Sequence, residues 1–492
     1  MSLRQRATAG TFWVGLSRAV RTFFQMLNGY ILARMLPPAD FGLVAMALIA
    51  IDFLDRFREM GFSSALIYHK GDTRKAADTT FVTLIVIGTV FFAVSFVAAP
   101  FVAAFYRTEA LTAMTRALSI NILISAFGQV QLSLLAKNLA FRERLLPDIV
   151  PTVAYGVAAA LMALMGLGVW SLVIARIANS ILTSVLAWAV VPWWRPRLRF
   201  DRQVAQELFD YGKHIVGSSL LIFWITNLDS TFIGRVLGAQ PLGYYGFAYK
   251  TANLPATHIS SIVGQVLFPA FSKIQDDIAT LRRAFLRTLH YVSTLSIPVA
   301  VGTIVFGGPF IYTLYGEEWS PAIVPLQLLG IYGLLRSVAV NMGSVFKAGG
   351  KPHWLTYIAV GRLAVMGVLL YPAAKYYGIV GVSVLSAAVS VVDFFISTAL
   401  TNRIIRGTLT DYGQALWAPC AFSLLSALVA RWSYLQIVAT GHGFISLVMG
   451  GIVMVLLYAL SVFFFDKDVR AFVLGSLSTI GQAGKEWMSS NR

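Results

Sequence analysis

Residues 79 to 104 read TTFVTLIVIGTVFFAVSFVAAPFVAA, an apolar stretch that contains no charged residue. A helix needs roughly 20 predominantly apolar residues to cross the hydrocarbon core of a bilayer, and this stretch meets that length. Comparable stretches recur along the whole chain and are separated mostly by short polar connections. Because lipid offers the backbone no hydrogen-bond partners, we expect each stretch to form a transmembrane helix.

The composition supports this reading. Of the 492 residues, 57% are hydrophobic and only 12% are charged, whereas roughly 25% of a soluble globular chain is charged. The sequence therefore predicts an all-α, polytopic membrane protein of about fourteen transmembrane helices. The expected spans cover residues 11–35, 41–62, 79–104, 112–136, 147–166, 168–192, 211–237, 243–269, 283–307, 322–347, 354–374, 378–402, 414–431 and 443–465.

The basic residues predict the orientation of these spans. In the predicted topology the external loops contain only Arg107, Lys375 and Arg431 of the 39 Lys and Arg residues. Basic residues are retained on the cytoplasmic side during insertion, so both termini are expected in the cytoplasm. The net charge of +17 mostly reflects this topology, and nucleic-acid binding is not expected.

An internal repeat predicts how the helices are organised. The segment ILARMLPPADFG (31–42) aligns without gaps with FIGRVLGAQPLG (232–243), with identical residues at Arg34 and Arg235, Leu36 and Leu237, and Gly42 and Gly243. Each segment lies where the first helix of a half turns into the second. Both halves begin inside and contain six spans, which predicts a parallel repeat about an axis along the membrane normal.

The expected organisation has four parts. Residues 1–192 form an N-terminal six-helix bundle, 193–213 a basic cytoplasmic linker, and 214–402 a second six-helix bundle. Residues 403–492 add two transmembrane helices and a cytoplasmic tail, which lie outside the duplication.

Several expected spans contain charged residues, each of which costs about 3 kcal/mol at the bilayer centre and must therefore face protein or water. In the first helix, Arg18, Arg21, Gln25 and Asn28 fall within roughly 80° of arc at 100° per residue. The second helix has Asp52, Asp55, Arg56 and Glu59 on one face, where Asp52 and Arg56 are spaced for an ion pair. This acidic face is interpreted as an inner gate, a coupling site or local neutralisation of Arg56.

The second half contains a further polar stripe. Lys250, Asn253, Thr257 and Ser261 lie along one side of the eighth helix, and Pro255 is expected to kink it. Later helices contain Arg336, Arg362 and Asp393. The nearby tyrosines Tyr244, Tyr245 and Tyr249 are interpreted as interfacial rather than as stacking platforms for sugars.

Arginine has a planar, permanently charged fork that matches the oxygens of a phosphate group. The preferred anion-binding residues are Arg18, Arg21, Lys250 and Arg336, with Arg362 as a further candidate. The alternative is that these residues pair with intramembrane acids and hold the two halves together.

The sequence contains no GxxxxGK[ST] loop and no GxGxxG segment after a strand, so a directly ATP-driven exporter is not expected. No cofactor, catalytic residue or metal site is predicted, and a coupling proton or sodium ion remains open. Cys420 is the single cysteine, which rules out an intramolecular disulfide.

The segment LDSTFIGRVLGAQPLGYYGFAYKTANLPATHISSIVGQVLFPAFSKIQDD (228–277) resembles the bacterial polysaccharide repeat-unit flippases of the multidrug/oligosaccharidyl-lipid/polysaccharide exporter superfamily. ILARMLPPADFGLVAMA (31–47), GFSSALIYHKGDTRKAADTTF (61–81) and YGEEWSPAIVPLQLLG (315–330) are similar to the same family. The resemblance implies that an undecaprenyl-pyrophosphate-linked oligosaccharide moves from the inner to the outer leaflet of the bacterial cytoplasmic membrane. Exopolysaccharide, capsule or O-antigen-type assembly would follow, with a polymerase and export machinery as partners.

Other functions are weighed against this one. A multidrug exporter of the same superfamily favours an acidic or aromatic cavity for cationic drugs, whereas these spans contain more bases than acids. A membrane polymerase or ligase needs catalytic residues on the external side, where the loops are short. A flippase for the lipid-linked peptidoglycan precursor is the alternative closest in mechanism.

Overall fold

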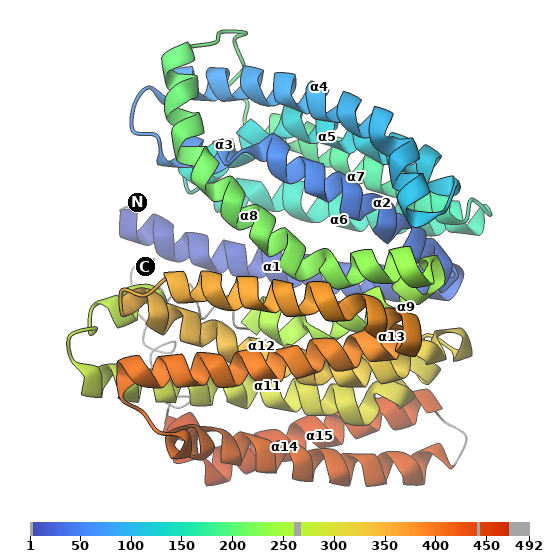
Figure 1. Ribbon diagram of the computed structural model, residues 1–492, viewed down its shortest axis with the longest axis vertical. Coiled ribbons are helices and arrows are strands. Elements are labelled where there is room, and N and C mark those ends of the chain that lie inside the picture. The colour runs from blue at the N-terminus through green and yellow to red at the C-terminus, as the bar shows by residue number, and fades with distance from the viewer. Residues whose placement is uncertain (1–2, 260–266, 440–442, 472–492) are drawn as a thin grey trace, which may run out of the picture. The chain divides into compact units, whose positions relative to one another are not determined.

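The computed structural model describes residues 3–259, 267–439 and 443–471, and these ranges contain helices but no strand (Figure 1). The expected all-α class is confirmed. The elements are α1 (Leu3–Met35), α2 (Pro38–Glu59), α3 (Phe62–Tyr68), α4 (Thr73–Tyr106), α5 (Ala110–Lys137), α6 (Phe141–Leu164), α7 (Val169–Val190), α8 (Arg202–Leu237), α9 (Ala239–Ala252), the π-helical turn η1 (Pro255–Ile259), α11 (Ile278–Leu314), the 3-10 helix η2 (Glu317–Ala322), α12 (Ile323–Ala348), α13 (His353–Ile405), α14 (Leu409–Val438) and α15 (Gly443–Phe465).

Among the described residues, 10 helices are long and apolar enough to cross a membrane. One of them, α13, is divided by the non-helical residue Gly378 (φ 61°, ψ −150°), which separates the spans expected at 354–374 and 378–402. Helices α1 and α2 are also long, with 33 and 22 residues, and contain the charged residues predicted within the membrane. Together with α9 and η1, these helices occupy the positions of the expected spans, and the chain is a multi-pass membrane protein.

The regular α-helix is interrupted near Pro255, where the sequence predicts a kink. Helix α9 ends at Ala252, and the π-helical turn η1 begins at Pro255. Proline lacks the amide proton that would continue the α-helical ladder, and its ring clashes with the preceding turn. The predicted polar residue Ser261 follows this turn and lies outside the described residues.

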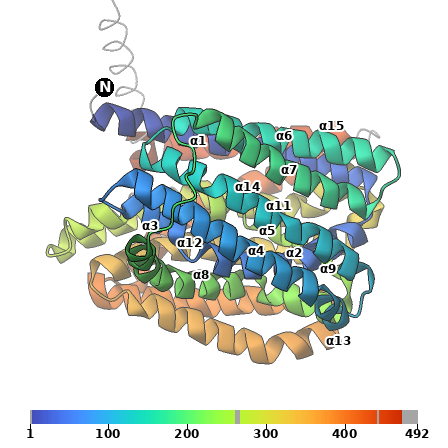
Figure 2. The ribbon, with the colours of Figure 1, turned by 90° about the horizontal axis from the view of Figure 1, so that it is seen from above.

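The chain divides into two compact units. Unit 1 comprises Met1–Gly246 and Ala374–Gly378, and unit 2 comprises Phe247–Ala373 and Ile379–Arg492. Within unit 1, α6 and α7 run side by side (Figure 2). The structural boundary falls inside α9, whereas the sequence places a bundle boundary at 193–213, which stays a prediction.

The two C-terminal helices of unit 2 are fixed to α11 by polar contacts. His290 of α11 has Nδ1 2.7 Å from the carbonyl oxygen of Ala415 and Nε2 2.7 Å from Oδ2 of Asp466. Arg282 donates from Nη2 to both carboxylate oxygens of Asp411, at 2.7 and 2.6 Å. These contacts make α14 and α15 part of unit 2 rather than a loose appendage.

The repeated segments form a reciprocal contact within unit 1. A Cβ atom added at Gly42 would lie 1.7 Å from the carbonyl oxygen of Ala239, and one added at Gly243 would lie 1.9 Å from that of Pro38. In the repeat alignment Gly42 matches Gly243, and Pro38 matches Ala239. The starts of α2 and α9 therefore touch through equivalent residues, backbone against backbone, as a two-fold relation requires.

Candidate functional site

The site begins with a close crossing of α9 and α12 in unit 2. A Cβ atom at Gly333 of α12 would lie 2.0 Å from the carbonyl oxygen of Ala252 at the end of α9. The absence of a side chain at Gly333 lets the two backbones approach each other. Polar side chains on both sides of the crossing, Tyr249 and Asn253 on one and Tyr332 and Arg336 on the other, can then meet.

Arg336 lies at the centre of this group. Its Nη1 donates to the hydroxyl oxygens of Tyr249 and Tyr332, at 3.2 and 3.3 Å, and to Oδ1 of Asn253 at 3.3 Å. The Tyr249 and Tyr332 hydroxyl oxygens are 3.4 Å apart. None of the three acceptors is a carboxylate, so they orient the guanidinium without forming a carboxylate ion pair with it.

A second guanidinium joins from α13. Arg362 donates from Nη2 to the Tyr332 hydroxyl at 2.9 Å, and its Cζ lies 5.2 Å from the centroid of the Tyr332 ring. Its Nη1 is 3.8 Å from Oδ2 of Asp393, in the second half of α13. Tyr332 is only 1% exposed and thus bridges the two arginines inside the protein.

This arginine cluster, formed by Tyr249, Asn253, Tyr332, Arg336, Arg362 and Asp393, has two permanent positive charges and one carboxylate. Its net charge is positive, and it lies on helices that cross the membrane. An excess positive charge in such surroundings is costly unless water or an anion approaches it. The arrangement is chemically suited to an anion with several acceptor oxygens, such as a phosphate ester.

The sequence predicted three members of the arginine cluster. The structure brings Asn253, Arg336 and Arg362 together. Lys250 and Thr257 lie on exposed positions of α9 and η1, and Thr257 donates to the carbonyl oxygen of Asn253 at 2.9 Å. Their part in binding stays a prediction.

The stripe predicted on α1 is divided in the structure of unit 1. Arg21 and Gln25 are exposed, and Arg18 is half-buried. Asn28 is buried, and its Nδ2 donates to the carbonyl oxygen of Thr152 on α6 at 2.8 Å. Asn28 lies at the edge of the predicted stripe. Its amide joins α1 to α6 through this hydrogen bond.

The acidic face of α2 contains an ion pair that the spacing did not single out. Arg58 donates from Nε to Oδ1 of Asp55 at 2.6 Å, and Arg58 is 2% exposed. Asp52 and Arg56 are exposed, and Glu59 is half-buried. The pair neutralises Asp55 locally, while a gating or coupling role for the four predicted residues stays a proposal.

The interfacial interpretation of the tyrosines is wrong for Tyr245 and Tyr249. Tyr245 is 0% exposed and its hydroxyl donates to the carboxylate of Asp229, while Tyr249 belongs to the arginine cluster. Tyr332 was missed altogether. Its position one helical turn before Arg336 was the available sequence clue, because residues at i and i+4 share a face.

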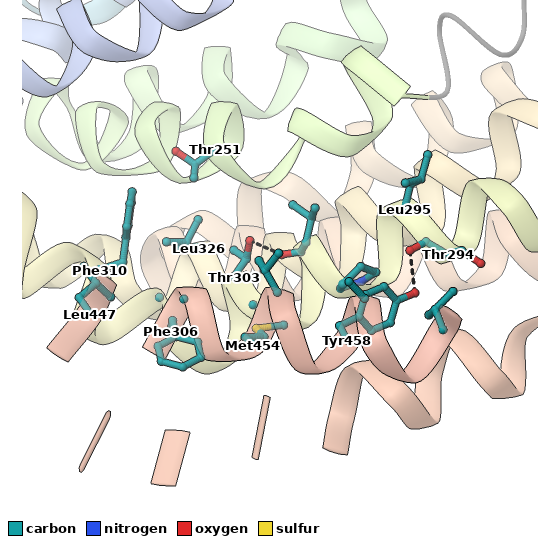
Figure 3. Close-up of a pocket in the computed structure, with 18 of the residues that line it drawn as sticks. Thr251, Thr294, Leu295, Thr303, Phe306, Phe310, Leu326, Leu447, Met454 and Tyr458 are labelled. Carbon is teal, nitrogen blue, oxygen red and sulfur yellow. Dashed lines mark hydrogen bonds between the residues drawn. The ribbon is translucent and has the colours of Figure 1, made fainter. Parts of the chain in front are cut away.

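Unit 2 also contains an apolar groove of about 830 Å³ (Figure 3). It runs between α11 and α15, with Pro298, Phe306 and Phe310 on one side and Met454 and Tyr458 on the other. Two of the hydroxyl groups beside it donate within the protein: the Tyr458 hydroxyl donates to the carbonyl oxygen of Thr294 at 2.7 Å, and the Thr303 hydroxyl donates to that of Val299 at 2.8 Å. The groove is therefore suited to a hydrocarbon chain.

The fold and the arginine cluster define a multi-pass membrane protein with a cationic group of side chains on its helices. A family model described as "Polysaccharide biosynthesis protein" matches residues 31–324. The chain belongs to this family.

Curated relatives agree with this assignment. The chain is 29% identical to the teichuronic acid biosynthesis protein TuaB of Bacillus subtilis, covering 87% of this chain and 89% of that one. It is 26% identical to the succinoglycan biosynthesis transport protein ExoT of Rhizobium meliloti, covering 86% of each.

A solved structure shares the fold. The lipid II flippase MurJ, in an inward closed conformation, matches 94% of this chain with a TM-score of 0.70. The sequence identity is 13%, so the likeness concerns the fold alone.

Proposed function

We propose that the protein is a flippase that moves an undecaprenyl-pyrophosphate-linked oligosaccharide from the inner to the outer leaflet of the bacterial cytoplasmic membrane. The observation that carries the proposal is the arginine cluster, which presents two guanidinium groups on membrane-crossing helices against a single carboxylate. Bidentate guanidinium groups match the oxygens of a diphosphate. The transport protein ExoT and the family description support export of a polysaccharide building block rather than of a drug.

The chemistry of the substrate explains why two separate surfaces are needed. A diphosphate and its sugars are too polar to cross hydrocarbon, whereas a polyprenyl chain is too apolar to enter a site lined by arginine. We propose that the headgroup binds at the arginine cluster and that the tail lies in the apolar groove of unit 2. The hydrogen bonds that the Thr303 and Tyr458 hydroxyls donate within the protein favour this division.

Residues in unit 1 complete the proposal. Arg18 and Arg21 are proposed to take part in anion binding, while Asp52, Asp55, Arg56 and Glu59 form an inner gate or a coupling site for a proton or sodium ion. Transport would proceed by alternating access, in which the headgroup site opens first to one side of the membrane and then to the other. A polymerase and export machinery are the proposed downstream partners.

Deletion of the gene tests the function. We expect the lipid-linked oligosaccharide to accumulate on the cytoplasmic side and the corresponding surface polysaccharide to disappear. Analysis of the accumulated lipid also separates this function from its nearest alternative. If the accumulated lipid were the peptidoglycan precursor, the diphosphate chemistry would stand but the polysaccharide assignment would be wrong.

The proposed orientation predicts which side of the membrane each loop faces. In a variant without Cys420, single cysteines introduced at Asp72 or Phe200 should react with an impermeant maleimide only from the cytoplasmic side. A cysteine at Glu318 should react from outside. The reason is the near absence of Lys and Arg from the predicted external loops. External labelling at position 200 would invert the topology.

The groove proposal predicts the effect of filling it. Gly451 lines the groove, and a Cβ atom added there meets nothing within 4 Å. Gly451→Phe should therefore insert a ring into the groove without disturbing the helices, and it should lower transport by tenfold or more. Gly367→Phe is the matched control, because Gly367 is equally open but lies on α13 away from the groove. Equal transport by both variants at equal protein level would place the tail elsewhere.

A further inference from the structure

The connection between α7 and α8 contains a short segment without regular secondary structure, WWRPRLRF (193–200), which we call the arginine arm. It is held against the start of α4 in unit 1. Trp194 is 3% exposed and its ring packs edge-on against Phe81, with centroids 6.0 Å apart. The backbone amide of Arg197 donates to Oδ1 of Asp78 at 3.2 Å. The arginine arm is therefore a fixed part of the fold.

A second set of contacts fixes the end of the arginine arm. The amide of Asp201 donates to the Thr79 hydroxyl at 3.3 Å, and Lys75 lies 2.7 Å from Oδ2 of Asp201. The hydrogen bond from Lys75 and that from the Val204 amide lower the pKa of the Asp201 carboxyl. This carboxylate caps α8 and stays ionised at neutral pH, so it holds the arm in one place.

The arginine arm exposes both apolar and basic side chains. Trp193, Leu198 and Phe200 are 54%, 86% and 56% exposed, although they belong to no membrane helix. Between them lie Arg197 and Arg199, whose side chains form no ion pair within the part of the chain that the structure describes. The fold thus leaves two cations and three large apolar side chains exposed on one short segment.

Arg195 differs from its two neighbours. Its Nη1 donates to the carbonyl oxygens of Trp188 and Val191, at 3.2 and 3.3 Å, and its Cζ lies 5.5 Å from the Trp188 ring. It caps the end of α7, where the last carbonyl groups of a helix lack partners. The side chains of Arg197 and Arg199 make no such capping contact within the described part of the chain.

The position of the arginine arm indicates what it contacts. It follows the last residue of one membrane helix and lies against the first turns of another, which is the level of the lipid headgroups. Tryptophan and apolar side chains insert at this level, while arginine reaches the phosphates. We propose that the arginine arm binds anionic phospholipid of the cytoplasmic leaflet, with Arg197 and Arg199 on the phosphates and Leu198 in the interface. The inference uses the proposed orientation but not the proposed substrate.

Lipid binding by the purified full-length protein tests the proposal. Native mass spectrometry would measure bound phosphatidylglycerol and phosphatidylcholine for the wild type and for an Arg197→Gln/Arg199→Gln variant. Since each basic residue near an anionic surface contributes on the order of a fivefold preference, the variant should lose tenfold or more of its affinity for phosphatidylglycerol only.

The matched control is an Arg403→Gln/Arg406→Gln variant, which removes the same charge from exposed positions at the end of α13. It should retain phosphatidylglycerol binding at the wild-type level. An equal loss in both variants would show a general effect of charge and would overturn the proposal.

The depth of the arginine arm gives a second, independent measurement. In a Cys420→Ala background, a fluorophore on Leu198→Cys should be quenched by headgroup-labelled lipid in phosphatidylglycerol vesicles and protected from aqueous iodide. Leu198 packs little, so this substitution leaves the fold intact. Strong quenching by iodide with no effect of the lipid quencher would overturn lipid insertion and would leave the arm as a docking surface for a soluble protein. Failure here would not affect the flippase proposal, which gene deletion tests separately.

Discussion

Arg336→Met is expected to abolish transport while the protein still inserts and folds. Methionine has a similar length and is apolar, but it removes the charge-assisted hydrogen bonds that a bound diphosphate would accept, each worth about 1.5–3 kcal/mol. Loss of one such bond corresponds to roughly a 10- to 100-fold decrease in apparent affinity. The measurement is transport of fluorescent lipid-linked oligosaccharide in proteoliposomes, with thermal stability in detergent determined in parallel. Arg336→Lys should rescue only in part, because an ammonium lacks the planar fork.

Asp393→Asn is the variant that separates a binding role from a structural one. It removes the carboxylate 3.8 Å from Arg362 and so raises the net positive charge of the arginine cluster. If the cluster binds an anion, Asp393→Asn should retain or strengthen substrate binding, whereas Arg362→Gln should weaken it. Equal losses of stability and transport in both variants would show that the pair only holds α13 together.

Gly42→Ala and Gly243→Ala are each expected to eliminate transport, with a large loss of folded protein. The added methyl group would lie 1.7 or 1.9 Å from a backbone oxygen, whereas real Cβ atoms essentially never approach closer than 3.0 Å. The starts of α2 and α9 would have to separate, and overpacking of this kind costs about 1–3 kcal/mol or more. Yield in the membrane and melting temperature measure the effect.

Gly29→Ala and Gly246→Ala are the controls for these substitutions. Both glycines are helical, and a Cβ atom at either position meets nothing within 4 Å. Alanine is favoured over glycine in a helix by about 1 kcal/mol, so these variants should be as stable as the wild type or slightly more stable. Normal melting of Gly42→Ala would contradict the close contact.

Most of the fold could be predicted from the sequence because lipid imposes a simple rule on it. The apolar stretches set the helices, and the non-helical residue Gly378 separates two of them at the expected position. The repeat could also be recognised in the sequence, since its matching segments contain the turns between α1 and α2 and between α8 and α9. The division into compact units could not be predicted from the sequence, because it depends on how α8 packs and not on hydropathy.

The candidate site was only partly predictable. Arg336 and Arg362 stood out because charges within spans are rare and costly. Tyr332 did not, because a tyrosine in a membrane helix is common and its bridging role depends on the close crossing at Gly333. Asn28 was placed with the polar face of α1, yet it bonds to α6. Helical spacing gives the face of a residue but not the neighbour that covers that face.

The reciprocal contact of Gly42 and Gly243 also has an evolutionary consequence. In a symmetric homodimer, one pair of residues encoded by a single gene forms both copies of such a contact, so a self-complementary surface arises without coordinated changes in two genes. Duplication and fusion of that gene would leave two copies of the glycine, each facing the counterpart of its own neighbour. Such an origin would account for the reciprocal contact. After such a fusion each copy would be free to diverge, and the arginine cluster, whose members all follow the second repeat segment, is an asymmetry that a homodimer cannot encode.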